Sequence, residues 1–471
     1  MRMSIKSYLA LWLMALVVGC SSALAGSNGD LFAAIKANDA QQVERLLEAG
    51  ADANGRNNEG LTPLFWAAVW GSDKAAEPLV AHGAQVNGKS GREEFTPLHT
   101  AAYNGHKDVA ELLIRKGADV NARSKSGWTP LHKAMEQLAF RPPTSEPEPS
   151  EVAKTIGMVE LLLSNGADVN AKSEGGTIPI HNAALSCQKA LVEALIAKGA
   201  DIDAKGPDDV TPLYLAAKKD CAEVAELLLA RGAQINARTK SGFTPLLISA
   251  EEGNPNVAKV LLEHGAGVNV KDKDGLTPLV WALKSLMVKY TLQASSPAAT
   301  QMRKKIGIAD LERDREALGK IKGAFSEVSL LLVNHGADPN IDVQGDTPVR
   351  MAALVGDQAL VKVLIEKGAD IKAVVNDANE SALHAAIAEG HREIAELLIN
   401  NGADVNAENM SRRTPLHFLA RYIHDRKLAE LMIQKGANVN AEDKDGRTPL
   451  SFATRAGNED VANVLRQHGG N

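Results

Sequence analysis

The chain of 471 residues carries a formal net charge of −6, and its residues are 45% hydrophobic but only 4% aromatic. A globular chain of this length would ordinarily divide into about three domains, each with its own core. The small negative charge argues against nucleic acid as a partner, because proteins that bind phosphate backbones gather positive charge.

The first element in chain order, residues 1–19, is typical of a secretion signal. Arg2 and Lys6 precede an apolar stretch, residues 8–18, which is too short for an ordinary membrane span. We therefore exclude this segment from the fold and expect a product that is exported from the cytoplasm.

Two cleavage sites compete after this signal. The run LVVGC, which ends at Cys20, resembles a bacterial lipobox and implies a lipid on that cysteine, although Val18 stands where a smaller residue is usual. Ser21 would then favour the outer membrane under the sorting rules of such lipoproteins, with residues 20–29 as a short tether that reaches roughly 30 Å. Residues 23–25 (ALA) instead suit ordinary signal peptidase, which would release a soluble periplasmic protein.

Beyond the tether, the stretch of residues 94–126 reads EFTPLHTAAYNGHKDVAELLIRKGADVNARSKS. Thr96 can cap a helix that starts at Pro97, since proline lacks the amide proton that a first-turn residue does not use. Gly105 ends this short helix, and apolar residues at helical spacing predict a second helix that stops at Gly117. A helix pair this short cannot bury its apolar faces alone, so we expect each unit to stack on its neighbours.

The same register recurs through residues 30–471 in about twelve units, and most intervals between equivalent positions are 33 or 34 residues. The Thr-Pro-Leu-His and Gly-Ala-Asp-Val-Asn-Ala motifs resemble ankyrin repeats. This resemblance implies an all-α solenoid of antiparallel helix pairs with short β-hairpin-like turns, in which one array replaces separate domains. The equivalent prolines are Pro63, Pro97, Pro130, Pro179, Pro212, Pro245, Pro278, Pro348, Pro415 and Pro449, with Ala382 in the place of one more.

Four segments depart from the repeat. Residues 30–59 and 446–471 lack parts of the motif and are expected to cap the two ends of the array. An insertion at about 136–157 contains RPPTSEPEPS, residues 141–150, whose prolines and acids predict a flexible loop rather than helix. A second insertion, at about 285–325, has an apolar stripe at helical spacing and predicts a projecting helical hairpin, with a disordered linker as the alternative for its central part.

Few residues suggest chemistry. One histidine per unit follows Thr-Pro-Leu or its equivalent, but successive units are too far apart for these side chains to share a metal at about 2 Å. In ankyrin repeats this histidine bonds the backbone of adjacent turns. The chain has no metalloprotease, phosphate-loop or nucleophile-elbow motif. We therefore predict no enzyme activity, no metal and no cofactor; a rival hypothesis, an active site in the second insertion, would rest on residues 304–314, which read as a solvated helix face.

Two cysteines follow Cys20. Cys187 takes the place of the glycine between paired helices, and Cys221 lies one place later in the next unit, where histidine is usual. A disulfide between them in an oxidising compartment would contribute roughly 3 to 4 kcal/mol in the chain-entropy model. Two free thiols are the alternative, because equivalent positions of neighbouring repeats are typically too far apart to bridge.

The usual binding face of ankyrin proteins, their concave side, is formed by the turn tips and the exposed ends of the first helices. Aromatic residues gather at such positions in the N-terminal units, which is typical of a protein interface with aromatic anchors. The alternative is that these side chains merely cover neighbouring turns. The residues that we expect to contact a partner are Leu61, Trp70, Phe95, Tyr103, Trp128 and Phe243.

The sequence thus predicts a non-enzymatic scaffold of the bacterial envelope that binds a partner protein through its N-terminal repeats. We expect no nucleic acid and no small-molecule substrate. Two alternatives keep the same architecture. One is an immunity protein that neutralises a toxin directed at the envelope, and the other is a soluble periplasmic binding or assembly factor.

Overall fold

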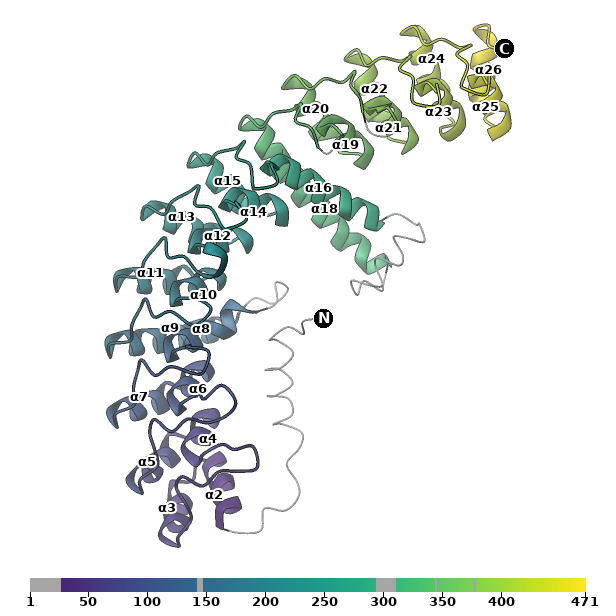
Figure 1. The fold of residues 1–471 in the computed structure, drawn as a ribbon. Helices are drawn as coiled ribbons and strands as arrows, with labels where there is room; N and C mark the ends of the chain where they lie inside the picture. The colour runs from purple at the N-terminus through teal and green to yellow at the C-terminus, as the bar shows by residue number, and fades with distance from the viewer. Residues whose placement is uncertain (1–26, 142–146, 294–310, 344, 376–377) are drawn as a thin grey trace. The chain divides into compact units, whose positions relative to one another are not determined.

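The computed structural model describes residues 27–141, 147–293, 311–343, 345–375 and 378–471. The chain divides into two compact units, Met1–Asp201 (unit 1) and Ile202–Asn471 (unit 2). Within each unit, short helices follow one another in antiparallel pairs, and successive pairs stack (Figure 1). The all-α prediction is confirmed. The predicted signal segment and Cys20 lie outside the described residues.

Unit 1 contains an N-terminal pair and four further pairs among the residues that the structure describes. The first helix of each pair packs on the first helix of the next, and the second packs on the second. The helices are α2 (Ser27–Lys36), α3 (Ala40–Glu48), α4 (Pro63–Trp70), α5 (Asp73–Ala81), α6 (Pro97–Asn104), α7 (Lys107–Arg115), α8 (Pro130–Ala139), α9 (Pro149–Ser164), α10 (Pro179–Leu185) and α11 (Lys189–Ala197).

Unit 2 continues the same alternation, and we call the first helix of any pair an inner helix. A two-residue antiparallel ladder joins β1 (Val374–Val375) to β2 (Glu380–Ser381) at one turn tip. The helices are η1 (Pro207–Asp209), α12 (Pro212–Lys218), α13 (Ala222–Ala230), α14 (Pro245–Glu252), α15 (Pro255–Glu263), α16 (Pro278–Gln293), α18 (Leu311–Asn334), α19 (Pro348–Val355), α20 (Gln358–Glu366), α21 (Ala382–Ala388), α22 (Arg392–Asn400), α23 (Pro415–Tyr422), α24 (Arg426–Gln434), α25 (Pro449–Ala456) and α26 (Glu459–Gln467).

The recurring asparagine of the turn motif joins many repeats of the stack to the next repeat. Asn87 donates through Nδ2 to the carbonyl oxygen of Gly117 at 3.1 Å, and its Oδ1 accepts from the backbone N–H of Asp119 at 2.8 Å. Asn54 makes the same two bonds to the turn of the next repeat. One amide group therefore satisfies a donor and an acceptor that a helix end leaves free, which explains why the motif recurs.

The two insertions differ in how far they continue the helices. Around the first, α9 starts at Pro149, where proline suits the first helical position, so the predicted loop 141–150 is too long by its last two residues. Residues 142–146 lie outside the described part. Around the second, α18 is the longest of the described helices, α16 is as long as α9, and α16 and α18 pack against each other (Figure 1). Phe325 joins Leu286 and Val355 in a buried cluster there, and residues 294–310 are not described.

Candidate functional site

Three of the predicted contact residues surround one ammonium group. The Nζ atom of Lys133 lies 4.7 Å from the ring centroid of Phe95, 4.7 Å from that of Tyr103 and 6.0 Å from that of Trp128. The same Nζ donates to Oε2 of Glu136, one turn further along α8. We call these five residues the lysine cage.

The fold brings the cage together from three successive stretches. Phe95 lies just before α6, Tyr103 is on the last turn of α6, and Trp128 lies just before α8. The side chain of Lys133 is only 5% exposed and that of Glu136 is 15% exposed. A cation on aromatic faces contributes about 2 kcal/mol when desolvated, and the carboxylate supplies the charge that such a buried ammonium group needs.

The charge of Glu136 reaches beyond its lysine partner. Burial raises the pKa of the Tyr103 hydroxyl, and the nearby Glu136 carboxylate raises it further. Tyr103 therefore stays neutral through the physiological range and offers an uncharged phenol to any partner. The backbone oxygen of Tyr103 also accepts from Nε2 of Gln137 at 2.8 Å, which ties α6 to α8 at the same place.

Trp70 belongs to a second group, which we call the tryptophan cluster. Its ring is 5.9 Å from that of Trp66 in an edge-to-face arrangement, and Trp66 meets Phe32 in the same way at 6.1 Å. Nζ of Lys36 lies 4.3 Å above Trp70. Neither indole Nε1 atom has a hydrogen-bond partner among the described residues, although both atoms are buried. The cluster joins α2 to α4, next to the cage-bearing helices.

Two of the predicted contact residues lie elsewhere. Leu61 is fully buried and belongs to the core, so its assignment to the partner surface is wrong. Its aliphatic side chain packs inside the stack, whereas the aromatic rings at the equivalent positions, Phe95 and Trp128, stay half-buried. Phe243 belongs to unit 2, where its ring packs against Trp281 at 5.3 Å.

The lysine cage and the tryptophan cluster both depend on residues that were not among the predicted contact residues. Lys133, Trp66 and Trp281 all lie four residues after the motif threonine. In two repeats this position meets the residue that precedes the motif one repeat earlier: Lys133 meets Phe95, and Trp281 meets Phe243. The sequence did hold a signal for the cage: Lys133 stands at a position that is large and apolar in most other repeats.

The histidines that follow Thr-Pro-Leu have a structural role in the repeats that the structure describes. His99 accepts at Nδ1 from the backbone N–H of Thr96 at 3.2 Å, and its Nε2 bonds the carbonyl oxygen of Trp128 in the next unit at 2.9 Å. His132 repeats the arrangement one unit later. Burial lowers the pKa of each of these two imidazoles to about 4, against opposing backbone hydrogen bonds, so both are neutral at pH 7. They hold turns together and expose no reactive nitrogen.

Cys187 and Cys221 occupy two repeat positions, those of a glycine and a histidine, whose residues contact each other in other repeats. Cys187 has φ of 57° at the glycine place, and Cys221 is buried at the histidine place. In unit 1 the ring of His106 lies so close to Gly71 that an added Cβ would be 2.6 Å from its Nδ1. Both cysteines are disulfide-bonded in the structure. Cys187 belongs to unit 1 and Cys221 to unit 2, so their pairing with each other stays a prediction.

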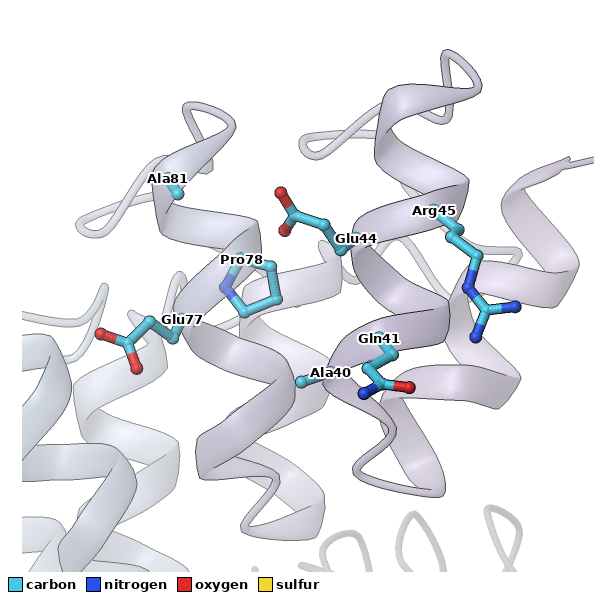
Figure 2. A pocket seen from close by; sticks show the side chains of 7 residues that line it. All are labelled: Ala40, Gln41, Glu44, Arg45, Glu77, Pro78 and Ala81. Carbon is cyan, nitrogen blue, oxygen red and sulfur yellow. The ribbon is translucent and has the colours of Figure 1, made fainter.

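A shallow hollow of about 530 Å³ lies between the second helices α3 and α5 (Figure 2). Long polar side chains, two alanines and Pro78 form its wall, and Pro78 lies inside α5, where it contributes no N–H. None of the predicted contact residues lines it. The lining residues are Ala40, Gln41, Glu44, Arg45, Glu77, Pro78 and Ala81.

Models of ankyrin repeats match most of the sequence. A three-copy model matches residues 30–90, 151–239, 235–296, 320–409 and 407–471, a many-copy model matches residues 79–134, and a single-repeat model matches residues 126–174. The chain belongs to the ankyrin repeat family. Ankyrin repeats typically bind other proteins and are typically non-catalytic.

Curated relatives resemble this ankyrin protein over short segments. A mitochondrial disaggregase of Bos taurus is 39% identical over 85 residues, which are 17% of this chain and 13% of that protein. A palmitoyltransferase of Gibberella zeae is 36% identical over 63 residues, 13% of this chain and 9% of the relative. The alignments thus span a small fraction of these relatives.

Two further findings concern the part of the chain that the structure describes. None of its helices is long and apolar enough to cross a membrane. Among the same residues, no group of three or more histidine, cysteine, aspartate or glutamate side chains could hold a metal ion.

Proposed function

We propose that this ankyrin protein is a non-enzymatic scaffold that binds a partner protein through the inner helices of unit 1. The observation that carries the proposal is the gathering of half-buried aromatic rings on α4, α6 and the residues that precede α6 and α8. Rings with one face packed and an edge available anchor many protein interfaces, because they bury area at little cost in conformational entropy. The exposed Lys36 adds positive charge beside Trp70, whereas the lysine cage has no net charge because Glu136 pairs with Lys133.

Trp70 and Tyr103 are the best probes of this surface. Both lie on the last turn of an inner helix, and both are half-exposed, so their truncation leaves most of the core in place. Losing one such anchor typically costs about 1 to 2 kcal/mol of binding free energy or more. Trp281→Ala in unit 2 is a matched control, because it removes an aromatic ring of an inner helix outside unit 1.

The experiment is affinity capture from the envelope fraction of the source cells with the purified chain as bait. A partner should be captured by the wild-type chain and by Trp281→Ala, and lost with Trp70→Ala combined with Tyr103→Ala. Thermal unfolding of each variant checks that the fold is retained. Equal capture by the double variant would remove unit 1 as the binding surface.

We further propose that the chain is attached to the bacterial envelope through a lipid on Cys20. The support is the sequence LVVGC after a basic and apolar leader. Labelled palmitate should enter the wild-type protein and be absent from Cys20→Ala. An unlabelled wild-type protein whose N-terminal residue is Gly26 would instead establish cleavage after residues 23–25 and a soluble periplasmic product.

A further inference from the structure

The last two inner helices carry a surface of a different chemistry. Helices α23 (PLHFLARY) and α25 (PLSFATRA) pack side by side, and neither contains an acidic residue. Each has an exposed arginine on its last turn, Arg421 and Arg455. The preceding inner helix, α21 (ALHAAIA), has no charged residue, although the exposed Glu389 caps its C-terminal end.

Aromatic rings support the arginines of this surface. The guanidinium carbon of Arg421 lies 5.1 Å from the ring centroid of Tyr422, and Tyr422 is 50% exposed. Phe418 lies beside Tyr422 with the ring centroids 6.0 Å apart. A guanidinium that stacks on a ring keeps its N–H edge free for an acceptor, so stacking orients the donor instead of consuming it.

Two further arginines, just before α23 and just before α25, are held by one aspartate. Nε of Arg413 lies 3.2 Å from Oδ2 of Asp443, and an Nη atom of Arg447 lies 2.8 Å from the same oxygen. Both guanidinium groups also lie over Phe452, at 5.2 and 5.3 Å. Burial alone would raise the pKa of Asp443, but the hydrogen bonds from Arg447 and Arg413 hold it well below its usual range. Asp443 therefore stays charged and fixes both arginines in place.

The charges of this surface do not cancel. Asp443 is 1% exposed and faces inward, whereas Arg413 and Arg447 are 28% and 35% exposed. Arg447 also contacts the exposed Asp445. No ion pair of Arg421 or Arg455 is found among the described residues. The outward-facing excess is thus positive and comes from planar donors that match carboxylate geometry.

We infer that the inner faces of α23 and α25 form a docking surface for a carboxylate-rich segment of a partner protein. Stacked guanidinium groups offer paired donors to aspartate or glutamate side chains, and the half-exposed Tyr422 offers apolar area beside Arg421. The surface lies in unit 2 and is independent of the aromatic surface proposed for unit 1.

The test uses the purified full-length chain and a fluorescein-labelled peptide of glutamate and glycine, followed by fluorescence anisotropy at low salt. Arg421→Gln combined with Arg455→Gln should weaken binding at least about tenfold, because both free charges of the surface are lost. The control is Arg412→Gln combined with Arg426→Gln, which removes the same charge from a turn and from α24. It should change binding by less than about twofold.

Three results would overturn the inference. One is that the wild-type chain does not bind the glutamate peptide, or binds the matching glutamine peptide equally well. Another is an equal loss in both double variants, which would reduce the effect to net charge. The third is tighter binding of oligo-dT than of the glutamate peptide, which would mark the surface as one for phosphate backbones.

Discussion

The lysine cage makes a quantitative prediction about the coupling between Lys133 and Glu136. Glu136→Gln removes the carboxylate and leaves a 5% exposed ammonium group to the three rings. At an effective dielectric constant of about 20, two charges about 4 Å apart attract by about 4 kcal/mol. The rings still contribute about 2 kcal/mol and the new amide oxygen accepts a hydrogen bond. We therefore expect a loss of about 2 to 3 kcal/mol in the free energy of unfolding, below the usual cost of orphaning a buried charge.

Lys133→Met should lower the free energy of unfolding by less, about 1 to 2 kcal/mol, because methionine keeps the apolar stem and Glu136 is exposed enough to be hydrated. The double variant leaves no buried charge, and its cost should be close to that of Lys133→Met alone. The two sites should then be coupled by about 2 to 3 kcal/mol. Lys284→Met is a matched control, since Nζ of Lys284 lies 5.2 Å from the Trp281 ring without a carboxylate partner among the described residues.

Urea denaturation at pH 7, followed by tryptophan fluorescence, measures all four proteins of the cycle, and Trp128 reports directly on the cage. The control variant should lose less than about 1 kcal/mol. Additive costs, with a coupling under about 0.5 kcal/mol, would show that the ammonium and carboxylate groups do not depend on each other. The buried ion pair would then be ruled out as the reason for a lysine at this position.

Three further predictions concern the stack itself. Gly71→Ala should lose about 2 to 3 kcal/mol in urea denaturation, because its φ is 70° and the new Cβ would lie 2.6 Å from a histidine ring; Gly60→Ala, which meets nothing within 4 Å, should lose only about 1 kcal/mol. Stability should fall as the pH drops from 6.5 towards about 4, since burial lowers the pKa of His99 and the unfolded chain takes up the proton first; equal urea midpoints at pH 7 and about pH 5 would contradict this. Peptide mapping without reductant should yield Cys187 linked to Cys221, whereas two alkylated thiols would disprove the pairing.

Local chemistry accounts for what the sequence predicted well. A threonine cap, a proline at the first helical position and a glycine at φ of 70° after Asn104 act within a few residues, so the bounds of α6 follow from the motif. The register of the repeat then decides which positions lie on the inner helices. For the same reason the structural role of His99 could be expected from its place in the repeat.

Contacts between neighbouring units were decided by the tertiary structure. Leu61 and Phe95 share one position in the repeat, yet Leu61 is fully buried and Phe95 stays half-exposed against Lys133. That outcome depends on the size and charge of a side chain more than thirty residues away, which the register places nearby but does not specify. Asp443 shows the same limit, because its place in the repeat does not reveal that the fold buries it between two arginines.

The sequence by itself therefore determined the family, the helix pairs and the positions that form the inner surface, because these depend on short-range periodicity. Only the tertiary structure decided which of those positions are core, which hold buried charges and which remain open to a partner. The physical reason is that stacking brings together side chains from adjacent units, and their packing and ion pairing are set jointly by both.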